Sequence, residues 1–155
     1  MHSITIEGDM IMNNVDELRT LLVSLKKTLE KLLEVENRKT GILEKGNPSD
    51  LDALLNEEQA ILMECSSAEK QRMRICEKLN VSSVSEILEK IPEAGSKIND
   101  IHSEMLEMVK AIKKVNSLNM KLLDTRLKIV KFMTSKLGVA TDEVKYDKNA
   151  KTVSN

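Results

Sequence analysis

The side chains of this chain that could perform chemistry are its carboxylates, two cysteines and two histidines. The 25 acidic residues recur at helical spacings among 24 basic ones, a pattern typical of solvated helix faces rather than of paired catalytic acids. His2 and His102 lie far in sequence from Cys65 and Cys76, so no metal-ligand spacing exists, and the five glycines form no phosphate-binding loop. We therefore expect no catalytic residues, no metal and no cofactor, and we predict that the protein is not an enzyme.

The composition excludes further classes of function. With a formal charge of −1 and 1% aromatic residues, the chain lacks the basic surface and stacking side chains that nucleic-acid binding requires. No apolar run reaches the roughly 20 residues of a membrane-spanning helix. The acidic residues Glu7 and Asp9 near the start do not resemble a signal peptide, so we expect no membrane insertion and a cytoplasmic location.

The elements that must position any site are helices. Apolar residues recur every three or four positions from Ile98 to Leu137, as in one long coiled-coil helix. Similar patterns predict a first helix from Asn13 or Asn14 to Lys45, and a second that Ser49 caps and that runs to about Leu79. A shorter helix follows over residues 84–90, with Ser82, Ser83 and Glu86 as a capping box.

These elements indicate an all-α protein: an antiparallel helical bundle or coiled coil of three long helices with one short connecting helix. The core must consist of aliphatic residues and methionine, since aromatic residues are almost absent. We expect a loosely ordered N-terminal segment over residues 1–12, a single bundle domain over residues 13–138 that Gly138 closes, and a flexible C-terminal tail over residues 139–155.

The second half of the last helix carries more apolar surface than one seam needs. Beyond Val115 the ladder continues while a second apolar row appears beside it, and polar Asn119 and Arg126 stand where the ladder expects hydrocarbon. The second row consists of Leu123, Leu127, Val130 and Leu137. Such a surface either packs two neighbouring helices or binds a partner. A structural coiled-coil scaffold or dimerisation module is the alternative to a client-binding protein, and a homodimer stays open.

Three stretches of the chain resemble the FlgN-type flagellar export chaperones. The first comprises coiled-coil positions of the first two helices: Leu29, Leu32, Leu33, Glu36, Asp52, Leu54, Leu55, Glu58, Leu62, Glu69, Arg72 and Leu79. The second is an asparagine and leucine segment: Asn116, Asn119, Leu122, Leu123 and Leu127. The third is the tail motif over residues 146–150, where Ala150 stands in place of the family's glycine.

This resemblance implies a cytoplasmic chaperone that binds the terminal amphipathic helices of flagellar hook–filament junction (hook-associated) proteins. Such a chaperone prevents their premature assembly and delivers them to the flagellar type III export apparatus. We expect the client to contact the surplus apolar surface, with the two asparagines setting its register. The client-binding residues would be Asn116, Leu118, Asn119, Met120, Leu122, Leu123, Leu127, Val130 and Met133. The resemblance assigns Tyr146 and Asp147 in the tail to docking on the export gate or its ATPase complex.

Overall fold

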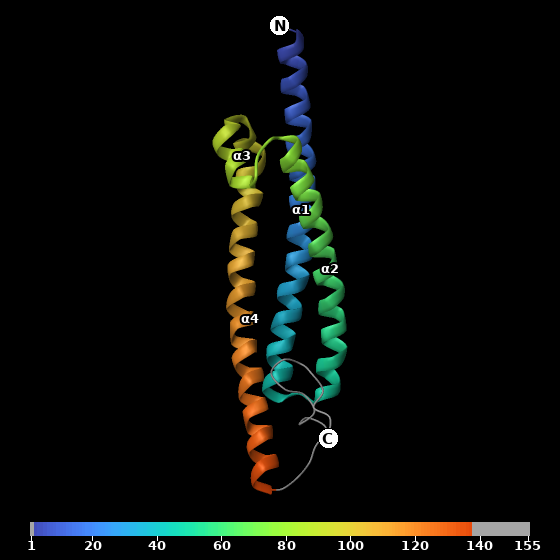
Figure 1. Ribbon diagram of the computed structural model, residues 1–155, viewed down its shortest axis with the longest axis vertical. Coiled ribbons are helices and arrows are strands. Elements are labelled where there is room, and N and C mark those ends of the chain that lie inside the picture. Colours follow the sequence, from blue (N-terminus) through green and yellow to red (C-terminus); the bar gives the residue numbers. More distant parts are fainter. Residues whose placement is uncertain (1, 138–155) are drawn as a thin grey trace.

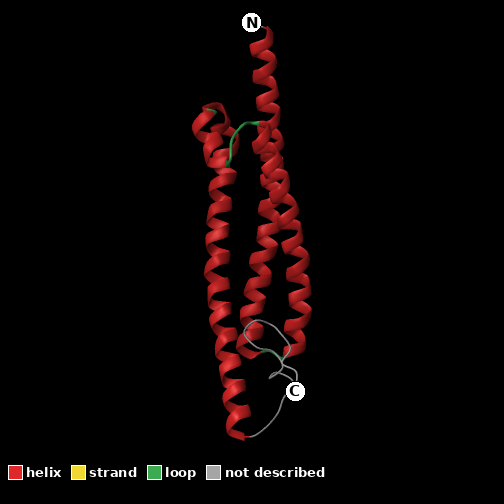
Figure 2. Ribbon diagram, in the orientation of Figure 1, coloured by secondary structure: helices red, strands yellow, loops and turns green. Residues whose placement is uncertain are grey.

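The described part of the chain, residues 2–137 of a computed structural model, is helical throughout apart from short turns (Figure 2), which confirms the all-α prediction. In chain order the elements are α1 (His2–Lys45), α2 (Pro48–Lys78), α3 (Val84–Lys90), a 3₁₀ turn η1 (Pro92–Ala94) and α4 (Gly95–Leu137). No helix among these residues is long and apolar enough to cross a membrane. Gly138 and the tail over residues 139–155 lie outside the described residues.

Helix α1 packs along both α4 and α2 (Figure 1). Consecutive long helices run in opposite directions, so α1 and α2 are antiparallel whereas α1 and α4 are parallel. The ion pairs show this register, since Arg19 meets Asp100 and Lys26 meets Glu104 further along both helices. The antiparallel description therefore holds for neighbours in sequence but not for the α1–α4 pair.

Helix α2 is capped two residues earlier than the sequence suggested. Asn47, rather than Ser49, is the N-cap residue of α2, and its side-chain oxygen accepts hydrogen bonds from the backbone N–H groups of Ser49 and Asp50. Pro48 then occupies the first helical position, where its fixed φ and missing N–H cost nothing. The proline thus moves the start of the helix ahead of the serine.

The corner between α2 and α4 follows the sequence prediction. Asn80 adopts a left-handed conformation with φ 56°, which lets the chain leave α2. The Ser83 hydroxyl accepts a hydrogen bond from the Glu86 N–H, and the Glu86 carboxylate accepts one from the Ser82 N–H, which completes the capping box. A hydrogen bond from Lys90, together with those from Ser82, lowers the pKa of Glu86 to about 2.

The start of α1 differs from the sequence prediction. We expected the helix to begin near Asn13 or Asn14 after a loosely ordered segment, but it begins at His2. An asparagine can cap a helix or lie within one, and once a helix is nucleated each added residue gains a hydrogen bond at low entropic cost. The buried core nevertheless begins only at Val15, with Met12 packed against it.

Two aliphatic clusters hold the helices together. The first joins α1 to the ends of α2, α3 and α4 around Leu18, Leu22, Ile87 and Ile98. The second lies further along α1, where its residues from Leu25 to Val35 pack against α2 and against Met105, Met108, Val109 and Ile112 of α4. Large buried leucines fill both clusters in place of aromatic residues.

We predict that Leu22→Ala lowers the free energy of unfolding by about 3 kcal/mol, because it leaves a cavity that the long helices cannot collapse around. Leu22 is 1% exposed. Leu106→Ala is the matched control: Leu106 is 50% exposed on α4, so its truncation should cost less than about 0.5 kcal/mol. Urea denaturation followed by circular dichroism measures both, and equal losses would contradict the assigned core.

Candidate functional site

The second half of α4 exposes a group of large apolar side chains. Several of them are about half exposed or more, which is unusual for residues of this size on one helix segment. They are Leu118, Met120, Leu123, Ile129, Phe132 and Met133. Four of these six were predicted from the sequence as client-binding residues, and the structure leaves them accessible.

Two further residues were missed by the sequence prediction. Ile129 belongs to the apolar ladder, and Phe132 is the only phenylalanine in the chain. Ile129 is 53% exposed and Phe132 is 62% exposed. The end of α4 extends beyond the turn between α1 and α2 (Figure 1). The overhang itself could not be predicted from the sequence because it depends on the relative lengths and offset of packed helices.

The apolar residues form two rows that flank a polar row. At 100° per residue, Asn119 and Arg126 fall on nearly the same side of α4. Leu118 and Leu122 lie on one flank of that polar row, whereas Leu123 and Leu127 lie on the other. Leu122, Leu127 and Val130 are half-buried, whereas Leu118 and Leu123 are exposed. Each leucine pair thus has one member that is partly covered and one that faces solvent.

Asn119 faces α1 and is 3% exposed. Its Nδ2 donates hydrogen bonds to the Glu36 backbone oxygen at 2.9 Å and to Glu36 Oε2 at 3.0 Å. The Thr40 hydroxyl donates to Asn119 Oδ1 at 2.6 Å. Asn119 therefore sets the register of α4 on α1 in this structure, a role that periodicity cannot distinguish from setting the register of a client helix.

Asn116 is placed differently from Asn119. It is exposed at the edge of the seam, where its Nδ2 lies 3.5 Å from Glu36 Oε2. A bond of this length is weak, so Asn116 keeps most of its capacity to bond to another molecule. The structure thus leaves one of the two predicted asparagines accessible and buries the other.

Arg126 closes the lower end of the seam between α1 and α4. Its guanidinium donates to the backbone oxygens of Ile42 and Leu43, both at 3.2 Å, and of Gly46 at 3.4 Å. Ile42 and Leu43 belong to the last turn of α1 and Gly46 follows it, and this terminus carries the negative end of the helix dipole. The Ile42 oxygen also accepts a hydrogen bond from the Gly46 N–H at 2.7 Å. Arg126 interrupts the apolar ladder because it caps a neighbouring helix.

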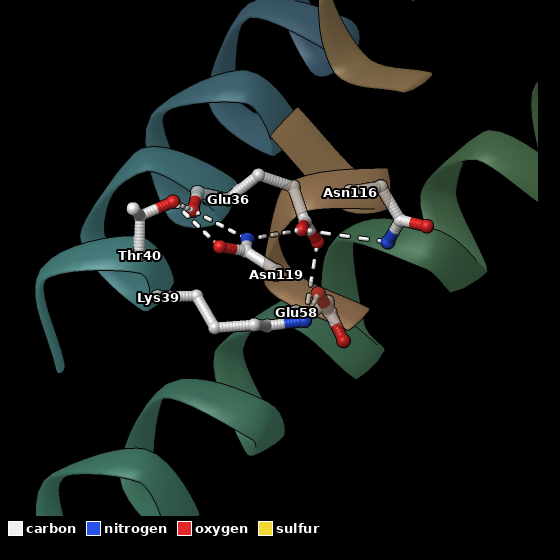
Figure 3. Close-up of polar contacts among 6 residues, drawn as sticks. All are labelled: Glu36, Lys39, Thr40, Glu58, Asn116 and Asn119. Atoms are coloured by element: carbon white, nitrogen blue, oxygen red, sulfur yellow. Dashed lines mark hydrogen bonds and ion pairs between the residues drawn. The ribbon is translucent and has the colours of Figure 1, made fainter. Parts of the chain in front are cut away.

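A buried ionic cluster accompanies Asn119 (Figure 3). Glu36, which is 2% exposed, pairs with Lys39 at 3.2 Å, and Lys39 also pairs with Glu58 of α2. Burial and the nearby Glu36 carboxylate raise the pKa of Glu58 above its usual value. Burial alone would also raise the pKa of Glu36, but hydrogen bonds from Glu58 and Asn119 and the charge of Lys39 hold it below its usual value. The two carboxyl groups thus differ, since the pKa of Glu36 is lowered and the pKa of Glu58 is raised.

A shallow apolar groove lies between α1 and α4 above this cluster. Leu33, Met108 and Ala111 line an open space of about 460 Å³, with Lys26 and Glu104 among the charged residues at its edge. The sequence pattern did not distinguish Leu33, Met108 and Ala111 from the other apolar residues of α1 and α4. The groove lies on the same flank of α4 as Leu118 and Leu122.

The described residues offer little for covalent or metal chemistry. No group of three or more potential ligands among them could hold a metal ion. His102 is half-buried, Cys76 is buried and Cys65 is half-buried. Tyr146 and Asp147, which were predicted to contact the export apparatus, lie outside the described residues.

Comparison with known proteins gives one family. The model of the family described as FlgN protein matches residues 10–154, which includes nearly the whole described bundle. No curated protein and no solved structure matches the chain significantly.

We predict that Glu58→Gln stabilises the fold relative to wild type increasingly as the pH rises from about 4 to 7. Because the pKa of Glu58 is raised in the folded protein, Glu58 contributes to stability below the pKa that its carboxyl group has in the unfolded chain. This contribution is lost as the pH rises through the pKa of Glu58 in the folded protein. Glutamine imitates the protonated acid at every pH. Chemical denaturation at a series of pH values measures the difference.

Glu57→Gln is the matched control. Glu57 precedes Glu58 but makes an exposed ion pair with Arg38, so its replacement should change the free energy of unfolding by less than about 1 kcal/mol across this range. A difference between Glu58→Gln and wild type that shrinks as the pH rises would contradict the raised pKa of Glu58.

Proposed function

Because the chain belongs to the FlgN family, we propose that it is a cytoplasmic export chaperone of the bacterial flagellum. It binds the terminal amphipathic helices of hook–filament junction proteins, keeps them from assembling early and delivers them to the type III export apparatus. The observation that carries this proposal is the exposed apolar surface of α4 from Leu118 to Met133.

That surface has the dimensions of a helix-binding site. Sixteen residues of α4 at 1.5 Å each give about 24 Å, or roughly four turns, which is enough to bind a client helix of similar length. Each large apolar side chain that a client covers fully would contribute about 1.5–3 kcal/mol. The mixture of leucine and methionine suits helices of more than one sequence, since methionine adapts to irregular partners.

The polar residues of the site divide between two roles. Asn116 is accessible to a client and can contribute to its register. Asn119 belongs to the proposed site as well, but a client can reach its amide only after α4 separates from α1. We also include Ile129 and Phe132, whose exposure on α4 continues the same surface.

We predict that the double variant Leu123→Asp, Leu127→Asp abolishes capture of the junction proteins in a pull-down with purified components. Two carboxylates on one flank of α4 would have to be desolvated beneath an apolar client face. Circular dichroism must show that the variant keeps the helical content of the wild type.

Leu106→Asp is the control for the added charge, because Leu106 is 50% exposed on α4 but lies before the proposed surface. It should bind as the wild type does. Unchanged binding by the double variant would remove this surface from the proposal. An obligate dimer in light scattering that buries Leu123 and Leu127 would instead favour the scaffold function.

We predict that removal of residues 139–155 impairs export while sparing client binding, because the proposal assigns Tyr146 and Asp147 to the export apparatus rather than to the client. Secretion of the junction proteins by cells that carry the truncated chain measures export, and the pull-down measures binding. Loss of binding in the truncated chain would contradict this division. Tyr146→Ala with Asp147→Ala in the full chain tests the motif itself.

A further inference from the structure

The contact between α1 and α4 changes its chemistry near Ile112. Before this residue α4 contributes hydrocarbon to both clusters, through Ile98, Ile101, Met105, Met108, Val109 and Ile112. None of the residues 113–136 of α4 belongs to either apolar cluster. The hairpin of α1 and α2 and the second half of α4 are therefore held together in another way.

Two polar ties join this part of α4 to α1, beside side chains such as Leu122 and Leu127 that are half-buried. The upper tie joins Asn119 to Glu36 and Thr40, and the lower tie joins Arg126 to the last carbonyls of α1. A hydrogen bond contributes a net amount of about 0.5–1.5 kcal/mol, since water replaces it when the groups separate. Separating two apolar helix faces has no such compensation. Water can therefore substitute for the two polar ties when α4 separates from α1, whereas it cannot substitute for the apolar clusters above them.

The half-buried leucines beside these ties are the inner part of the proposed client surface. Leu122 and Leu127 are half-buried against the hairpin, and Leu43 of α1 is 4% exposed. With the seam closed, a client helix meets only the outer parts of the two rows. With the seam open, the client helix would reach Leu122, Leu127 and Leu43, and its polar groups could bond to Asn119 and Glu36 between them.

We propose that the segment of α4 after Ile112 is an arm that the two polar ties hold against α1, and that it swings outward to admit the client helix between α4 and α1. This inference concerns how the client surface is exposed, and it rests on the proposed function. The ties set the fraction of molecules that are open, so they reduce the apparent affinity for the client by that fraction.

Opening needs no break in α4. Long helices curve smoothly with radii of about 60–100 Å, and such a curve moves the end of a 30 Å segment by roughly 5–7 Å. The interaxial distance of packed helices is about 8–10 Å. Bending of α4 together with a small movement of the hairpin makes room for one client helix while the apolar clusters stay closed.

The test uses Arg126→Ala in the full chain, because Arg126 lies outside both apolar clusters and the fold should survive its loss. Hydrogen exchange of the free protein should show amides of residues 116–130 exchanging at least about tenfold faster than those of residues 98–112. Arg126→Ala should accelerate exchange in the first segment by about tenfold and tighten binding of the purified junction proteins about three- to tenfold.

Lys26→Ala is the matched control. Lys26 is also partly buried and joins α1 to α4 through Glu104 at 3.0 Å, but it lies beside the apolar half of the seam. It should change neither the exchange of residues 116–130 nor the affinity. Thr40→Val, which keeps the shape of the side chain and removes one hydrogen bond of the upper tie, should act in the same direction as Arg126→Ala and replaces it if that variant unfolds.

The outcomes separate this inference from the proposed function. If Arg126→Ala and Thr40→Val leave exchange of residues 116–130 unchanged, or accelerate it while binding weakens, the arm is overturned although client binding stands. If neither wild type nor variants bind the junction proteins, the proposed function fails, and with it the role of the arm in admitting a client.

Discussion

The Glu36 carboxylate is a buried charge at the centre of the molecule, and a buried charge must be paired. Lys39 on its own helix, Glu58 on α2, and Asn119 on α4 all bond to it or to each other, so the three long helices meet at one point. Slipping either neighbour along α1 by one turn would remove the partner that this neighbour contributes, Glu58 or Asn119, whereas Lys39 of α1 would remain. The cluster thus specifies the register of helices whose leucine ladders alone would tolerate several alignments.

The same cluster lies at the boundary between two parts of the bundle in which α4 contacts the other helices differently. Above it the helices are joined by aliphatic packing, which the short helix α3 closes at the end of the molecule. Below it α4 is joined to the hairpin through polar groups, and it continues past the turn between α1 and α2. Stability is therefore concentrated in one half, while the other half keeps apolar surface available for binding.

A chaperone of this kind has to expose hydrocarbon without associating with its own copies. Charged residues surround the apolar rows of α4. One example is the ion pair of Asp124 and Lys128, which lies on the helix surface between the Leu123 and Leu127 pair and Phe132. Such interspersed charges limit the size of any continuous apolar patch. Under the proposed function, a client that supplies its own apolar face and complementary charges would cover this surface.

Local information was enough for the helical class, for the ends of most helices and for the apolar rows of α4. Helical periodicity, the Gly46–Asn47–Pro48 turn and the Ser83 and Glu86 cap act over a few residues, so the sequence alone determines them. The start of α1 was predicted wrongly because the sequence does not distinguish an asparagine that caps a helix from one that lies within it. The parallel pairing of α1 with α4, the destination of Asn119 and the exposure of Phe132 depend on contacts about 80 residues apart in sequence. Only the tertiary structure could decide these features, because a pattern within one helix shows which side is apolar but not which partner covers it.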